Sequence, residues 1–146
     1  MTDQVISLPT IEANLSPEAF HRTSYHFYKC FQDFESPDSF SPLPFFLLCR
    51  AIELRLKSLH LQSLKQSRVK SQFGHNLVEA YRSLQLSDQH LDSGEFNTLI
   101  AANAIYQKKG FEYFVPEDAL SGYSRYPDLR LLDAIARKLN CHVASP

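Results

Sequence analysis

The stretch from Pro42 to Leu64 constrains the fold most, because it carries apolar side chains on two faces of one helix. Its main stripe has the spacings of three and four residues that an α-helix produces, at Phe45, Cys49, Ile52, Leu56 and Leu59. A second series, Leu47, Leu54 and Leu61, recurs every seven residues on nearly the opposite side. Such a helix needs apolar neighbours on both sides, so we expect it to be central or shared with a second subunit.

Local start and stop signals predict four further helices around this one. Ser16-Pro17-Glu18 is typical of a helix start, and Asp92 and Glu95 have the spacing of a capping box. The five expected helices run from Pro17 to about Ser36, Pro42 to Leu64, Asn76 to about Ser87, Asp92 to about Tyr106 and Pro127 to about Leu139.

The segments between these helices have loop character. Residues 65–72 contain three cations, no acid and no apolar period, which predicts a basic connector, and residues 111–115 are expected to form an ordered loop. Residues 1–15 and 141–146 are expected to be flexible ends. We therefore predict a single all-α domain over residues 1–146, an antiparallel helical bundle of about five helices.

Composition excludes several functional classes. Lys and Arg total 15 against 16 for Asp and Glu, so the chain has no bulk positive charge with which to coat nucleic acid. Its four glycines are too scattered for a glycine-rich phosphate loop. Three widely spaced cysteines suggest reduced thiols in a cytoplasmic protein, and no apolar run approaches the roughly 20 residues that span a bilayer. No metal site or cofactor is predicted, since the histidines and cysteines lack ligand spacing.

Two segments resemble the HEPN superfamily. Residues 49–57 carry an alanine, glutamate and leucine-lysine pattern on the second helix, and Gly74-His75-Asn76-Leu77 is similar to the Gly-His-Asp-Leu helix start of that family, with Asn76 where Asp is more usual. The resemblance implies a small all-α protein, often a homodimer. It also implies a role linked to RNA or nucleotides, commonly in bacterial toxin-antitoxin, defence or stress systems, sometimes beside a nucleotidyltransferase partner.

The nuclease branch of the HEPN superfamily carries an arginine and a histidine with four to six residues between them, and Arg68 and His75, with six residues between them, satisfy this rule. The resemblance implies a metal-independent endoribonuclease in which His75 acts as general base or acid on the ribose 2′-hydroxyl or the leaving oxygen, and Arg68 stabilises the charge that develops on the phosphate. Val69 departs from the family, which usually has a polar residue there. In the alternative, His75 is a structural residue of the helix start.

The basic segment is also a candidate nucleic-acid surface. Lys65, Arg68 and Lys70 could hold a phosphate backbone, and Phe73 could stack a base beside Asn76. The alternative is a solvated, charged surface without a ligand.

Glu53 and Lys57 lie four residues apart, so on a helix they face each other, with His60 on the same flank. We interpret this pair as a structural ion pair that orients the helix or a subunit interface, without a catalytic role.

The sequence thus predicts a HEPN-like, RNA- or nucleotide-associated helical module that forms a homodimer. Two alternatives stay open. One is the metal-independent endoribonuclease with Arg68 and His75, and the other is a non-catalytic interaction module that partners a nucleotidyltransferase.

Overall fold

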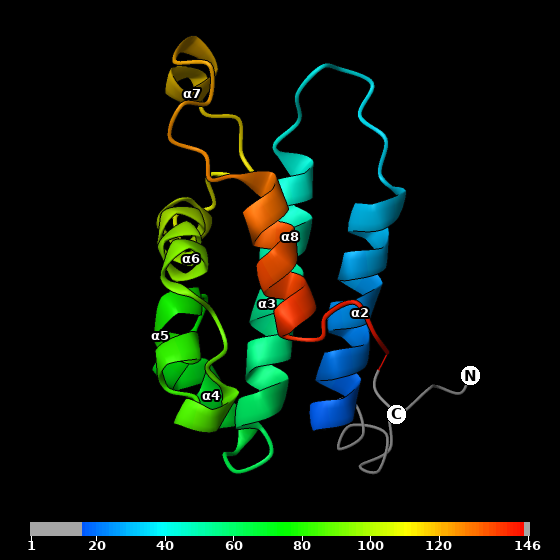
Figure 1. The fold of residues 1–146 in the computed structure, drawn as a ribbon, viewed down its shortest axis with the longest axis vertical. Coiled ribbons are helices and arrows are strands. Elements are labelled where there is room, and N and C mark those ends of the chain that lie inside the picture. The colour runs from blue at the N-terminus through cyan, green and yellow to red at the C-terminus, as the bar shows by residue number, and fades with distance from the viewer. Residues whose placement is uncertain (1–15, 145–146) are drawn as a thin grey trace, which may run out of the picture.

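The computed structural model describes residues 16–144, and this part of the chain is all-helical (Figure 1). It holds seven α-helices, one 3₁₀ helix and no strand, which confirms the all-α prediction with two α-helices more than expected. In chain order they are α2 (Pro17–Asp33), α3 (Leu43–His60), α4 (Gln66–Phe73), α5 (Leu77–Arg82), η1 (Leu86–Asp88), α6 (Ser93–Tyr106), α7 (Pro116–Leu120) and α8 (Leu129–Lys138).

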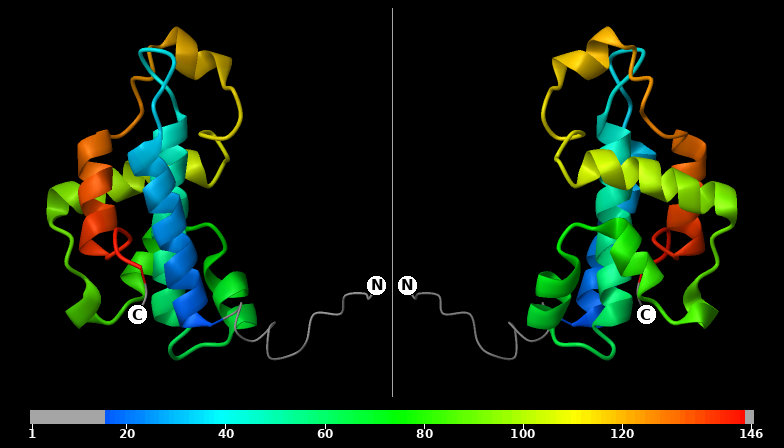
Figure 2. Two further views of the ribbon diagram at one scale, coloured as in Figure 1. Left: turned by 90° about the vertical axis from the view of Figure 1, so that its right-hand side faces the viewer. Right: turned by 90° about the vertical axis from the view of Figure 1, so that its left-hand side faces the viewer.

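Helix α3 is the centre of the fold. It contacts α2, α5, α6 and α8, and α6 runs crosswise to it (Figures 1 and 2). Both apolar faces are covered within one chain, since Phe45 is 5% exposed and Leu47 and Leu54 are each 8% exposed. Of the two explanations for its second apolar face, the central position therefore accounts for Leu47 and Leu54 without a second subunit.

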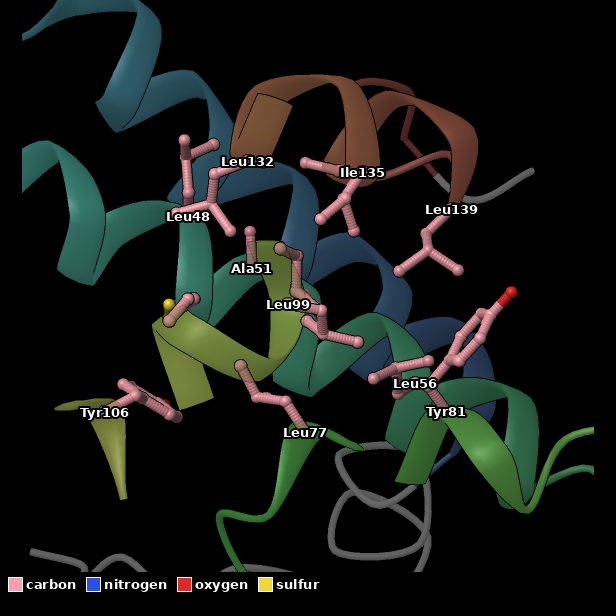
Figure 3. Close-up of a cluster of buried hydrophobic side chains, with 14 of the residues drawn as sticks. Leu48, Ala51, Leu56, Leu77, Tyr81, Leu99, Tyr106, Leu132, Ile135 and Leu139 are labelled. Atoms are coloured by element: carbon pink, nitrogen blue, oxygen red, sulfur yellow. The ribbon is translucent and has the colours of Figure 1, made fainter. Parts of the chain in front are cut away.

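The core forms where α3, α5, α6 and α8 meet (Figure 3). Its fully buried side chains include Leu48, Ile52, Leu56, Leu77, Leu99, Leu132 and Ile135. Burying a side chain of this size contributes about 1.5–3 kcal/mol, so this cluster holds the position of every helix that reaches it. No helix of residues 16–144 combines the length and apolar character that a bilayer crossing requires.

The prediction of a basic connector at 65–72 is wrong, because most of this segment forms helix α4. Val69 and Phe73, four residues apart, are 1% and 4% exposed and pack into the core, while the charged residues of the segment face solvent. Two apolar anchors are too few to produce a recognisable helical period in the sequence, but they suffice to dock one face of an eight-residue helix. Helix α7 is a second unpredicted helix, and α3 ends at His60 rather than Leu64.

The first residue of the expected flexible end at 141–146, Cys141, packs into the core. Cys141 is fully buried, its N–H donates to the Ala136 carbonyl at 2.9 Å, and its thiol contacts the Ala51 carbonyl at 3.5 Å. Nε2 of His21 lies 3.0 Å from the carbonyl oxygen of Asn140, which ties α2 to this turn. The other expected flexible end, residues 1–15, lies outside the described residues, as do residues 145 and 146.

Candidate functional site

Glu53 is a buried carboxylate in the middle of α3, with only 3% of its side chain exposed. Its Oε2 accepts hydrogen bonds from Lys57 Nζ at 2.8 Å and Arg50 Nη1 at 3.2 Å. Its Oε1 accepts one from Tyr106 Oη at 2.5 Å and lies 3.0 Å from His75 Nδ1. A buried charge needs partners of this kind, and here four side chains from three parts of the chain supply them.

Local geometry explains how these side chains converge. Arg50, Glu53 and Lys57 share one face of α3 through their spacings of three and four residues. Gly74 ends α4 with a φ of +52°, a left-handed conformation that glycine adopts without steric cost, and the chain turns there so that His75 reaches Glu53.

The hydrogen bonds set the protonation states of Glu53 and Tyr106. Burial alone would raise the pKa of Glu53, but the hydrogen bonds from Lys57, Tyr106 and His75 outweigh burial and hold this pKa below its ordinary value of 4.5. Burial and the adjacent negative charge of Glu53 raise the pKa of Tyr106 well above its ordinary value. At neutral pH, Glu53 is therefore an acceptor and Tyr106 a protonated donor.

Three of the groups that bind Glu53 also line a pocket of about 300 Å³. The pocket is lined by Phe46, Arg50, His75, Tyr106, Lys109 and Glu112. Its open side carries Arg50, which is one-third exposed, and His75, which is more than half exposed, and the lining is completed by Lys109 and by the exposed carboxylate of Glu112. The rings of Phe46 and Tyr106 supply an apolar wall beside these donors.

Lys109 reaches the pocket through a strained turn that ends α6. Lys109 has a backbone φ of 59°, in the left-handed region that residues other than glycine and asparagine rarely adopt. The following residue, Gly110, donates its N–H to the Ile105 carbonyl at 2.9 Å, and a Cβ there would lie 2.7 Å from Ile105 Cγ2. The tight turn thus requires Gly110 and places Lys109, three residues after Tyr106, at the pocket.

Of the residues predicted to be catalytic or to bind nucleic acid, His75 alone lines this pocket. Arg68 lies on the exposed side of α4, where its Nε donates to Gln72 Oε1 at 3.1 Å, and it does not line the pocket. Lys65 and Lys70 are likewise exposed on or beside α4.

The position of Phe73 contradicts the base-stacking role expected for it. Its ring is 4% exposed and stacks on His60 with the ring centroids 4.3 Å apart, so it belongs to the core. His60 in turn contacts the Ala80 carbonyl through Nε2 at 2.8 Å and is not a partner of Glu53. The ion pair expected between Glu53 and Lys57 is present.

Sequence reasoning missed Arg50, Tyr106 and Lys109. Arg50 had a usable signal, since it lies three residues before Glu53 on the same helix. Tyr106 and Lys109 had none, because their approach to Glu53 and His75 depends on how α6 crosses α3.

Asn76 accepts a hydrogen bond from the Glu79 N–H at 3.0 Å and begins α5. It lies outside the pocket at His75, in a neighbouring groove between α5 and α6.

Comparisons of the chain with protein-family models, curated proteins and solved structures find no match. What the pocket binds therefore has to be inferred from its own chemistry. Within residues 16–144, no three His, Cys, Asp or Glu side chains cluster in a way that could hold a metal ion. The pocket presents Arg50 and His75, both held by Glu53, together with Lys109, the carboxylate of Glu112 and two aromatic rings.

Proposed function

We propose that this chain is a HEPN-like helical module that binds a nucleotide or single-stranded RNA, with a phosphate group held between Arg50, His75 and Lys109. The observation that carries the proposal is that Arg50 and His75 are held by one buried carboxylate, Glu53. Donors fixed in this way lose little side-chain freedom when an anion binds, so more of the interaction energy appears as affinity.

The donors left over after pairing with Glu53 suit a phosphate. Arg50 bonds Glu53 through Nη1 and retains other N–H groups of its planar guanidinium, whose fork matches two phosphate oxygens. His75 faces Glu53 with Nδ1, and in the protonated imidazolium Nε2, on the other side of the ring, also carries an N–H that can donate to a phosphate oxygen. A pocket of about 300 Å³ is at the lower end of the range for small-molecule sites, so it suits the phosphate end of one nucleotide rather than a duplex.

The contact between the two HEPN-like segments supports the family resemblance. Residues 49–57 and 73–77 are separate in the sequence, and Glu53 of the first lies 3.0 Å from His75 of the second. The all-helical fold agrees with the same interpretation. A homodimer, a nucleotidyltransferase partner and a place in bacterial defence or toxin-antitoxin systems remain parts of the proposal that come from the resemblance alone.

The second candidate function is the metal-independent endoribonuclease. One observation favours it: Nδ1 of His75 faces a carboxylate, so in the neutral ring Nδ1 carries the proton and Nε2 is the atom that accepts a proton from a ribose 2′-hydroxyl. In this candidate Arg50, which lines the same pocket, takes the phosphate-stabilising role assigned from sequence to Arg68.

Fluorescence anisotropy with a short labelled single-stranded RNA tests the proposal. Arg50→Gln should weaken binding by about tenfold or more, since a charge-assisted contact to phosphate is lost, and should reduce the salt dependence. The matched control is Arg68→Gln, which removes an exposed arginine outside the pocket and should leave affinity within about twofold. Thermal unfolding of both variants checks that each remains folded.

Two results would overturn the proposal: no binding of RNA or mononucleotide by the wild-type protein, or equal weakening by Arg50→Gln and Arg68→Gln. Gel analysis of the same RNA in chelator separates the two candidates. New RNA ends that disappear in His75→Gln establish the endoribonuclease, and intact RNA establishes binding without cleavage.

A further inference from the structure

A second hollow of about 440 Å³ lies between α5 and α6, next to the phosphate pocket. The two hollows adjoin along the chain, because His75 and Tyr106 line the first while Asn76 and Gln107 line the second. The groove has apolar sides formed by Val78, Ile100 and Ala104, and Ile100 is 44% exposed. Three amide side chains, Asn76, Asn103 and Gln107, also line it, together with the charged side chains of Glu79 and Arg82.

Backbone contacts determine the orientation of the central amide. Asn103 is 7% exposed, and its Oδ1 accepts the Leu77 N–H at 2.8 Å. A backbone N–H can only donate, so the atom facing Leu77 must be the oxygen and the opposite atom must be the Nδ2 donor.

The orientation of Asn103 in turn determines that of its two neighbours. Its Nδ2 donates to Asn76 Oδ1 at 3.1 Å and to Gln107 Oε1 at 3.2 Å, and Asn76 Oδ1 also accepts the Glu79 N–H. Both amide oxygens are therefore occupied as acceptors. The amide nitrogens of Asn76 and Gln107 have no hydrogen-bond partner among residues 16–144, so this side of the groove offers donors to a ligand.

We propose that this groove holds the base of the nucleotide whose phosphate occupies the adjacent pocket, and that Asn76 and Gln107 select guanine and uracil over adenine and cytosine. The inference rests on the proposed function. Guanine O6 and uracil O4 are acceptors at positions where adenine and cytosine carry amino donors. The apolar sides of Val78, Ile100 and Ala104 suit the flat faces of a base, and the amide donors meet its edge.

Calorimetric titration with GMP, UMP, AMP and CMP at one salt concentration tests this inference. GMP and UMP should bind about tenfold or more tightly than AMP and CMP, because an amino group facing the amide donors leaves both unsatisfied. Gln107→Ala should reduce this preference without abolishing binding. Gln107 is exposed, so the substitution does not disturb the core.

Gln107→Glu tests the base preference more directly, because it replaces a donor with an acceptor. Its carboxylate can still accept from Asn103 Nδ2, but it presents an acceptor where the amide nitrogen stood. The preference should then shift toward AMP and CMP. Gln85→Glu is the matched control for the added charge, because Gln85 is exposed before η1 and lines neither hollow.

The outcomes separate the two proposals. Equal affinity for all four nucleotides, a preference for AMP or CMP, or a preference that Gln107→Glu leaves unchanged would overturn the base-reading role while Arg50-dependent binding stands. RNA binding that no mononucleotide displaces would also overturn it. Absence of all binding would remove the phosphate site as well.

Discussion

The hydroxyl of Tyr106 donates to Oε1 of Glu53 across 2.5 Å, and the same oxygen lies 3.0 Å from Nδ1 of His75. The first contact is buried and joins the end of α6 to the middle of α3. Tyr106 also lies at one end of the core cluster, with Tyr81 at the other (Figure 3). One carboxylate oxygen thus couples the packing of the core to the position of the imidazole.

Tyr106→Phe is expected to lower the free energy of unfolding by about 1–3 kcal/mol, because the buried Glu53 carboxylate loses one of its hydrogen-bond donors. Urea denaturation measures the change. Tyr113→Phe is the control, since Tyr113 is 65% exposed and its hydroxyl can bond water, and it should change stability by less than about 0.5 kcal/mol. A Tyr106→Phe protein as stable as the wild type would contradict the importance of this contact.

Acid should destabilise the protein through Glu53. Its pKa is lower in the folded state than its ordinary value of 4.5, so as pH falls the unfolded chain takes up the proton first. The stabilisation is fully present above pH 4.5 and is lost as pH falls through the folded-state pKa. The difference in unfolding free energy between wild type and Glu53→Gln should therefore shrink on acidification below this value.

Chemical denaturation of both proteins at neutral and acidic pH gives this difference. Asp118, whose pKa is lowered by its hydrogen bonds to Arg125, contributes acid sensitivity to both proteins and cancels in the comparison. At neutral pH, Glu53→Gln should cost about 3 kcal/mol, because it leaves Lys57 and Arg50 without their charged partner. A difference independent of pH would contradict the folded-state pKa.

Lys109 is expected to lower the stability of the fold through its backbone strain and to strengthen ligand binding through its charge. With a φ of 59°, Lys109→Gly relieves backbone strain, whereas Lys109→Ala keeps it, so the glycine variant should be more stable than the alanine variant by about 1 kcal/mol. Both variants remove the cation and should weaken RNA binding equally. Lys108→Ala, beside the pocket without lining it, is the control for charge. Equal stability of the two Lys109 variants would argue against strain.

Leu54→Ala should destabilise a single chain rather than separate two. Leu54 is 8% exposed within one chain, and truncating a buried leucine costs about 2–5 kcal/mol. The loss should be the same at low and high protein concentration, since stability that depends on association varies with concentration. Leu86→Ala, at a leucine that is 85% exposed, should have little effect. A loss confined to low concentration would instead place Leu54 at a subunit interface.

The sequence by itself determined the fold class and most helix starts, because these depend on neighbouring residues. Ser16 accepts the Ala19 N–H, and Asp92 and Glu95 form the expected capping box. The two apolar stripes of α3 likewise predicted a central helix. Helix α4 escaped prediction because only Val69 and Phe73 anchor it, and packing rather than periodicity stabilises so short a helix.

Only the tertiary structure decided which side chains form the site. His75 was recognisable from its motif, but Arg68 was expected beside it and Arg50 lies there instead. Tyr106 joins them because α6 crosses α3, and Lys109 because the turn at Gly110 follows directly. These contacts join residues that are far apart in the chain. A buried carboxylate needs hydrogen-bond donors, and only the packing of the helices decides which donors lie close enough to Glu53.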